Sequence, residues 1–289
     1  MLKNMLRDIA KRFSHRVAAL TYPVSLFRAG DVLIEDFLAR HLHANPKYQD
    51  PKRLNRYDFQ IFSQNGEDGM IQEIFRRIGT SNRFFLEFGV GNGLENNTAA
   101  LLLYGWSGAW IDGDTAQIAK IRRTYAQPIG AGRLALKNAF VSAENIEQHF
   151  RDLQVPAEPD FLSIDIDGND YWVWQAIEAY RPRVVVLEYN AHYGASLGWV
   201  QKYNPDHRWK GTSYFGVSLK ALEVLGRRKG YTLVACNFFG NNAFFVRGDL
   251  VADLFFAPFT AETHFEPARF YLYRRNGLRR ELGPYEIVE

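Results

Sequence analysis

Apolar residues follow two alternating patterns along the chain. Short runs of consecutive apolar residues, typical of strands buried on both faces, occur at 84–88, 108–111, 134–137, 161–166 and 184–187. Apolar residues at three- and four-residue spacing predict amphipathic helices at 64–78, 98–104, 115–125, 144–153, 171–180 and 218–229. Two more strands, 231–235 and 243–246, flank a short turn. We therefore expect an α/β fold with a mainly parallel, doubly wound sheet and an antiparallel C-terminal hairpin strand.

Three parts of the chain differ in texture. Residues 1–60 are expected to form a helical appendage interrupted by prolines, 61–250 the main domain, and 251–289 a tail that covers the pocket or holds a dimer partner. The first 20 residues interleave basic and apolar side chains at helical spacing. Such a helix suits an anionic membrane surface or an organellar presequence. Docking on its own domain or on a sister subunit in a homo-oligomer is the interpretation we favour.

Composition excludes several classes of protein. The 289 residues are 47% apolar and 23% charged, as in globular domains, and no apolar run approaches the ~20 residues of a membrane span. The 35 basic residues are scattered among 32 acidic ones, so we expect no nucleic-acid partner. The single cysteine, Cys236, cannot form an internal disulfide. A cytoplasmic location is therefore expected, with the inner face of the membrane as the alternative.

A glycine-rich turn follows the first predicted strand. It reads Glu87-x-Gly89-x-Gly91-x-Gly93, and glycines let the backbone turn sharply and approach a ligand. The nicotinamide fingerprint G-x-G-x-x-G/A fails, because its last position is Leu94. The acidic form is the one used for S-adenosylmethionine (SAM), whose sulfonium and amino groups suit a carboxylate.

Polar residues end the next two predicted strands. Asp112 lies about 20 residues beyond the glycines, where a carboxylate can accept both ribose hydroxyls; Asp114 is the alternative. Asn138 begins the loop expected to flank the adenine. The three strand ends together predict a SAM site at one edge of the sheet, and a solvated turn residue is the alternative for Asp112.

Acids also end the fourth and fifth predicted strands. Asp165 and Asp167 follow one strand, and Glu188 and Asn190 follow the other. Neighbouring acids repel one another unless a cation joins them, and oxygen ligands suit Mg²⁺ or Mn²⁺. We expect Asp165, Glu188 and Asn190 as metal ligands, with Asp167 next. Alternatively, residues 167–170 form only a turn and helix cap. A further alternative is that Asp165-x-Asp167 is the metal motif of a glycosyltransferase, but this interpretation leaves the glycine turn unexplained.

With these residues in view, the chain resembles the FkbM-like group of SAM-dependent methyltransferases over residues 60–250. The motifs that carry the resemblance are at 63–68, 85–93, 161–169, 184–190, 211–216 and 242–246. The resemblance implies a Rossmann-like methyltransferase fold and methyl transfer to an oxygen, commonly of a sugar or polysaccharide precursor. It also implies that Gln64 and Glu67 are pocket residues, although Glu67 could simply start a helix.

The general base is left open by this resemblance. Metal-dependent O-methyltransferases are similar in placing an acid where this chain has Asp165, but they carry Lys or His where it has Gly168. His192 and His207 are therefore the candidate bases, because imidazole accepts a proton near neutral pH. Asp165 is a candidate catalytic residue as well as a ligand.

A long irregular stretch, 192–216, is expected to bind the acceptor. Its candidate substrate-binding residues are aromatic or basic, as suits a sugar or an attached phosphate: Tyr193, Tyr203, Arg208, Trp209 and Tyr214. An interface loop is the alternative. The function expected from the whole sequence is metal-assisted, SAM-dependent O-methylation of a small-molecule or glycan substrate. A glycosyltransferase, a nicotinamide-dependent oxidoreductase and a non-catalytic scaffold are the rivals.

Overall fold

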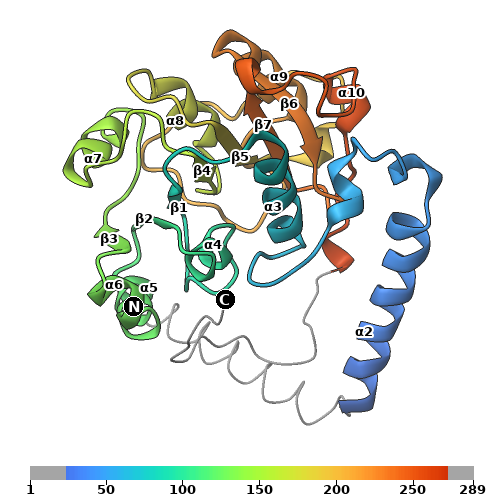
Figure 1. Cartoon of the computed structure of the whole chain (residues 1–289), viewed down its shortest axis with the longest axis horizontal. Helices are drawn as coiled ribbons and strands as arrows, with labels where there is room; N and C mark the ends of the chain where they lie inside the picture. Colours follow the sequence, from blue (N-terminus) through green and yellow to red (C-terminus); the bar gives the residue numbers. More distant parts are fainter. Residues whose placement is uncertain (1–23, 273–289) are drawn as a thin grey trace.

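The computed structural model describes residues 24–272, so the predicted N-terminal basic helix and the end of the tail lie outside it. Seven strands form one sheet in the order β3-β2-β1-β4-β5-β7-β6 (Figure 1). Their bounds are β1 (Phe84–Phe88), β2 (Ser107–Asp112), β3 (Leu134–Asn138), β4 (Phe161–Ile164), β5 (Val184–Glu188), β6 (Tyr231–Cys236) and β7 (Asn242–Arg247). Strands β1 to β5 pair in parallel, and β7 is antiparallel to both of its neighbours. The predicted mainly parallel, doubly wound sheet with an antiparallel C-terminal hairpin strand is confirmed.

Helices cover both faces of this sheet. Their bounds are α2 (Val24–Leu38), α3 (Glu67–Ile78), α4 (Ala99–Leu103), α5 (Thr115–Thr124), α6 (Ala126–Gly130), α7 (Ile146–Asp152), α8 (Asp170–Ala176), α9 (Leu219–Arg228) and α10 (Ala261–His264). Short helical turns are η1 (Ala39–His43), η2 (Pro46–Tyr48), η3 (Leu54–Tyr57), η4 (Ala191–Tyr193), η5 (Gly248–Leu250) and η6 (Phe270–Leu272).

The alternation of side chains along each strand builds two hydrophobic cores. Val184 and Val186 of β5 face the core made with α3, α4 and α5. Val185 and Leu187 face the other core, made with α7, α8 and α9. Burial on both faces explains why these strands are continuous apolar runs.

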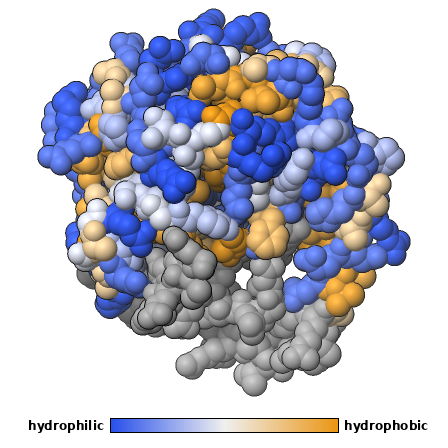
Figure 2. Space-filling model, in the orientation of Figure 1, coloured by the Kyte–Doolittle hydropathy of each residue, from blue (hydrophilic) through white to orange (hydrophobic). Residues whose placement is uncertain are grey.

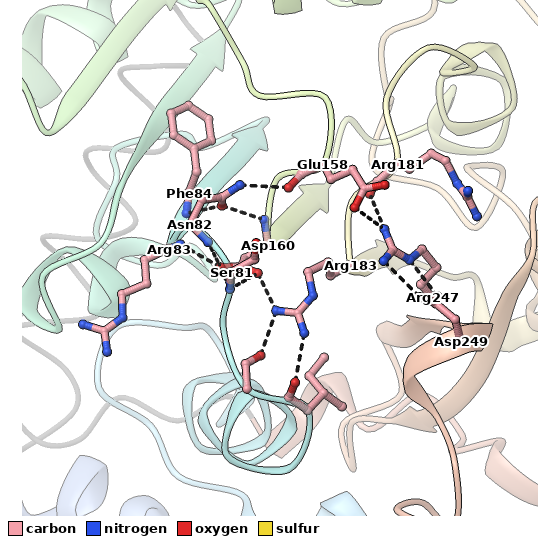
Figure 3. Close-up of polar contacts among 12 residues, drawn as sticks. Ser81, Asn82, Arg83, Phe84, Glu158, Asp160, Arg181, Arg183, Arg247 and Asp249 are labelled. Atoms are coloured by element: carbon pink, nitrogen blue, oxygen red, sulfur yellow. Dashed lines mark hydrogen bonds and ion pairs between the residues drawn. The ribbon is translucent and has the colours of Figure 1, made fainter.

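A buried ion pair secures the amino ends of the strands, opposite the polar strand ends (Figure 3). The Asp160 carboxylate accepts the backbone N–H groups of residues 81–83 and pairs with Arg183 at 2.7 Å. Arg183 also donates to the carbonyls of residues 78–79, at the end of α3. Through the fully buried Asp160, this network links the end of α3 to the segments that lead into β1, β4 and β5.

Helix α2 stands at one side of the molecule (Figure 1). Leu38 at its end and Leu42 in η1 pack with Phe238 and Leu272, so the N-terminal part and the tail meet at the β6–β7 turn. Val32 and Leu33 are 67% and 68% exposed, and apolar surface is visible over α2 in Figure 2. No helix within residues 24–272 is both long and apolar enough to cross a membrane.

Candidate functional site

A cavity of about 900 Å³ opens at the carboxyl ends of β1, β2, β4 and β5. A smaller cavity of about 310 Å³ adjoins it. The two share five lining residues: Gln64, Gly89, Gly91, Gln117 and Asp165. Carboxyl strand ends are where open α/β sheets bind ligands, so these cavities form the candidate site.

The three glycines of the turn have different surroundings. A Cβ on Gly89, whose φ is +78°, would lie 1.5 Å from the Asp165 carbonyl oxygen, so this glycine lets the turn pass against the loop after β4. Gly91 has a φ of +54° and open space where its Cβ would be. Gly93 instead packs against Tyr125 and Trp110 and lines neither cavity. Gly93 is therefore a packing residue, whereas Gly89 and Gly91 face the site.

Glu87 braces the segment after the glycine turn. Its buried carboxylate accepts the N–H groups of Asn97 and Thr98 at 2.9 and 3.1 Å and the Asn96 amide at 2.7 Å. Burial raises the pKa of Glu87, and these donors oppose that shift. The carboxylate lines the smaller cavity while holding its wall in place.

Asp112 lies beside the glycine turn, as its spacing predicts. Its two oxygens accept the N–H groups of Gly91 and Asp114, at 2.9 and 2.7 Å, and it lines the larger cavity. Burial raises the pKa of Asp112. Asn138 does not reach the cavity: its amide donates to the Asp112 carbonyl, and its oxygen accepts from Thr115. Residues 139–141 form that wall instead.

Three carboxylates gather where β4 and β5 end. One oxygen from each of Asp165, Asp167 and Glu188 lies within 4.8 Å of the others. Burial, and then repulsion from neighbouring acids, raises the pKa values of Asp165 and Glu188 well above their ordinary range. Glu188 Oε2 is buried and has no hydrogen-bond partner within the described residues. An unsatisfied buried oxygen in an acidic cluster fits a divalent cation.

The loop that presents Asp167 is held by Asp170. Strand β4 ends at Ile164, two residues earlier than predicted, so Asp165 and Asp167 lie on a loop. The Asp170 carboxylate accepts the N–H groups of Ile166 and Gly168 at 3.0 and 2.9 Å, and Asp167 has a φ of +57°. Burial raises the pKa of Asp170 to about 6. The expected turn and the acidic cluster are thus both present.

Asn190 is the main correction to the expected ligand set. Its amide donates to the carbonyls of Ser213 and Phe215, at 2.9 and 3.0 Å, and its oxygen accepts the His192 N–H at 3.2 Å. The side chain is fully buried and does not line the cavity. Asn190 anchors the long loop, and Asp167 takes its place among the candidate ligands.

The two candidate bases are placed differently. The His192 ring lies 3.0 Å from Asn190 Oδ1 and outside the cavity lining. His207 lines the cavity and covers Gly168 so closely that a Cβ there would lie 2.4 Å from the ring. Its Nε2 is buried without a hydrogen-bond partner in the described part of the chain. Burial raises the pKa of Asp167, and the nearby His207 ring partly offsets this shift. The structure thus brings His207, and not His192, to the acids.

The expected acceptor residues divide in the same way. Arg208 and Trp209 line the cavity, and the Arg208 guanidinium lies 4.1 Å from the centre of the Phe140 ring. The three tyrosines do not line it: Tyr193 stacks on Trp199, Tyr214 packs edge-on against the same ring, and Tyr203 bonds Glu144. These tyrosines therefore build the loop itself.

Sequence reasoning missed several residues of the cavity wall. They are mostly aromatic or amide side chains from distant segments: Asn65, Gln117, Phe140, Phe215, Phe239, Asn241 and Phe270. Three of them carried a signal: Asn65 and Phe215 lie within the motifs at 63–68 and 211–216, and Phe270 lies in the tail that was expected to cover the pocket. Gln117 lies on α5, and Phe140, Phe239 and Asn241 lie in loops without a recognisable motif.

Comparisons with known proteins yield likeness in fold only. No protein-family model matches the chain, and no curated protein matches it. Among solved structures it is similar to a candidate caffeoyl-CoA O-methyltransferase from Staphylococcus aureus, with a TM-score of 0.47 and 14% identity over 75% of this chain and 100% of that one. It is also similar to an O-methyltransferase from Bacillus cereus in complex with S-adenosylhomocysteine (SAH), with a TM-score of 0.41 and 15% identity over 80% and 94%. At this distance, function must be argued from this chain's own residues.

Proposed function

We propose that this chain is a SAM-dependent O-methyltransferase, assisted by a divalent cation, that methylates a hydroxyl of a sugar or glycan precursor. One observation carries the proposal: a single cavity is lined by the open Gly91 backbone, by Asp112 and by the three clustered carboxylates. A nucleotide site and an acidic site in one cavity suit a reaction between a nucleotide cofactor and a bound hydroxyl. Membership of the FkbM-like group is part of this proposal.

The cofactor half uses the β1 and β2 ends. Each Asp112 oxygen accepts one N–H and retains a second lone pair, so the carboxylate can still accept ribose hydroxyls. The 139–141 wall suits the flat adenine. SAM supplies an electrophilic methyl group on a sulfonium.

The acceptor half uses the β4 and β5 ends. Asp165, Asp167 and Glu188 would hold Mg²⁺ or Mn²⁺, which binds a hydroxyl and lowers its pKa. In this proposal His207, which lines the cavity and whose Nε2 has no hydrogen-bond partner within the described residues, would accept the hydroxyl proton. The Trp209 ring offers a face for a sugar, and Arg208 suits an anionic substituent on it.

The test is methyl transfer from labelled SAM to a panel of sugars, sugar phosphates and nucleotide sugars, with EDTA or with Mn²⁺. We expect a labelled product and SAH, lost with EDTA and restored by Mn²⁺. Binding of SAM without any product across the panel would indicate a non-catalytic scaffold. Turnover unaffected by EDTA would remove the cation from the proposal.

A further inference from the structure

We infer, resting on the function proposed above, that Glu67 is a positioning residue. It holds the Gln64 amide where the two cavities meet, and that amide binds the carboxylate at the amino-acid end of SAM. Glu67 itself lines neither cavity and is completely buried.

The two cavities match the two ends of the cofactor. The larger one contains Asp112 and the 139–141 wall, which suit adenosine. The smaller one lies beyond the glycine turn, against residues 95–97. A ligand that occupies both must pass Gln64 and Gly91, which line both. SAM has this shape, because its sulfur joins adenosine to an amino acid.

On this inference the smaller cavity, whose lining also includes Glu87, Glu95 and Asp165, binds a carboxylate without a cationic side chain. Among the described residues that line it there is no Lys or Arg. Three of its side-chain amides are occupied: Asn96 donates to Glu87, Asn97 to Ser163 and Asn242 to Glu67. The amides of Asn92, Gln117 and Gln64 remain, but Asn92 is exposed and the Gln117 oxygen accepts only from the exposed Lys120. Gln64, which neighbouring amides hold, is the donor best placed for the task.

Neighbouring amides orient Gln64. Its Oε1 accepts from Asn65 Nδ2 and from Asn241 Nδ2, both at 3.4 Å. Because the Gln64 oxygen faces these donors, the Gln64 Nε2 group has no hydrogen-bond partner within residues 24–272 and can donate to a ligand. A glutamine held in this way presents N–H groups to an anion.

Glu67 fixes the amides that fix Gln64. One carboxylate oxygen accepts the Asn65 backbone N–H at 2.8 Å. The other accepts from Asn237 Nδ2 and Asn242 Nδ2, at 2.7 and 2.9 Å. Asn237 in turn donates to the Asn241 oxygen. One buried carboxylate thus joins the loop before α3 to the β6–β7 turn, and both segments reach Gln64.

The test compares two ligands by calorimetry on the full chain. SAH carries the amino-acid end, and 5′-methylthioadenosine has the same adenosine and sulfur without it. We expect Glu67→Gln and Gln64→Ala each to weaken SAH binding about tenfold or more, as for loss of a hydrogen bond to a charged group. Both variants should leave methylthioadenosine affinity within about twofold. The double variant should bind SAH no more weakly than Gln64→Ala, since Glu67 acts through Gln64.

Two further variants complete the design. Asn241→Ala removes a Gln64 neighbour and leaves the three donors to the Glu67 carboxylate in place. Because Asn241 also lines the larger cavity, this variant should weaken both ligands but SAH more than methylthioadenosine, even if Glu67→Gln folds poorly. Gln72→Ala, on the same helix but bonded to Tyr104, should change neither affinity. Equal weakening of both ligands, or losses that multiply in the double variant, would overturn the inference. A wild-type protein that binds neither ligand would instead overturn the proposed function.

Discussion

Asp165→Asn is predicted to have opposite effects on stability without and with a divalent cation. Two unit charges 4.8 Å apart repel by about 3 to 4 kcal/mol at an effective dielectric constant of about 20. Partial protonation relieves some of this, because burial and repulsion raise the pKa values of Asp165 and Glu188. Removing one charge should therefore stabilise the metal-free protein by about 1 to 3 kcal/mol at pH 8.

The effect reverses when metal is present. A cation at about 100 times its dissociation constant stabilises the folded wild type by about 2.7 kcal/mol. Asp165→Asn removes a candidate ligand, so most of this gain should disappear in the variant. The sign of the difference between the two proteins thus depends on the cation.

Urea unfolding at pH 8, in EDTA and in MnCl₂, measures both effects. Asp206→Asn is the matched control, because this exposed acid precedes His207 but lies outside the cavity lining, and its removal should change neither curve. If Mn²⁺ stabilises Asp165→Asn as much as it stabilises the wild type, the three carboxylates are not a metal site.

Three other outcomes are expected. Without metal, the free energy of unfolding should fall as pH rises from about 5 to 7. Burial raises the pKa values of Asp68 and Asp170 to about 6 and those of Asp165 and Glu188 further, so the folded state holds protons that the unfolded state has released. Burial lowers the pKa of His264 to about 4, and this single group offsets only part of the fall. Urea curves at three pH values check this, and a rise would contradict it. Asp160→Ala should lower the free energy of unfolding in urea by about 3 to 5 kcal/mol, because it leaves the buried Arg183 charge without its partner. The SAH affinity measured by calorimetry should not change, because this ion pair lies at the opposite end of the sheet. Trp209→Ala should raise the KM for the acceptor about tenfold, because the acceptor loses an aromatic contact, and should change the KM for SAM by no more than about twofold. Equal changes in the two KM values would show that Trp209 does not contact the acceptor.

Strand ends were predictable because they combine two strong local signals. A run of buried branched residues such as 184–187 must be a strand, and a polar residue directly after it must lie at the strand's end. Parallel pairing then brings Asp112, Asp165 and Glu188 to one edge. The position of the cavity follows from this geometry, although much of its wall does not.

The fate of an individual polar side chain was not predictable, because its partners come from distant segments. Asn190 looks like a ligand by position, yet the carbonyls of residues 213 and 215 occupy its amide. In sequence Glu67 looks like the first residue of a helix, yet its carboxylate accepts hydrogen bonds from residues 237 and 242, which are distant in the chain. Gly93 matches the turn motif but is required by the packing of Tyr125. Such tertiary contacts leave no local pattern.

Calorimetric titration of the full chain with SAH tests the central claim most directly, namely that the cavity at residues 89–91 binds the methyl-donor nucleotide. We predict saturable binding at one site, weakened at least tenfold by Asp112→Ala through loss of the ribose contacts. Absence of binding at millimolar SAH, or tighter binding of NADH at the same site, would contradict the account.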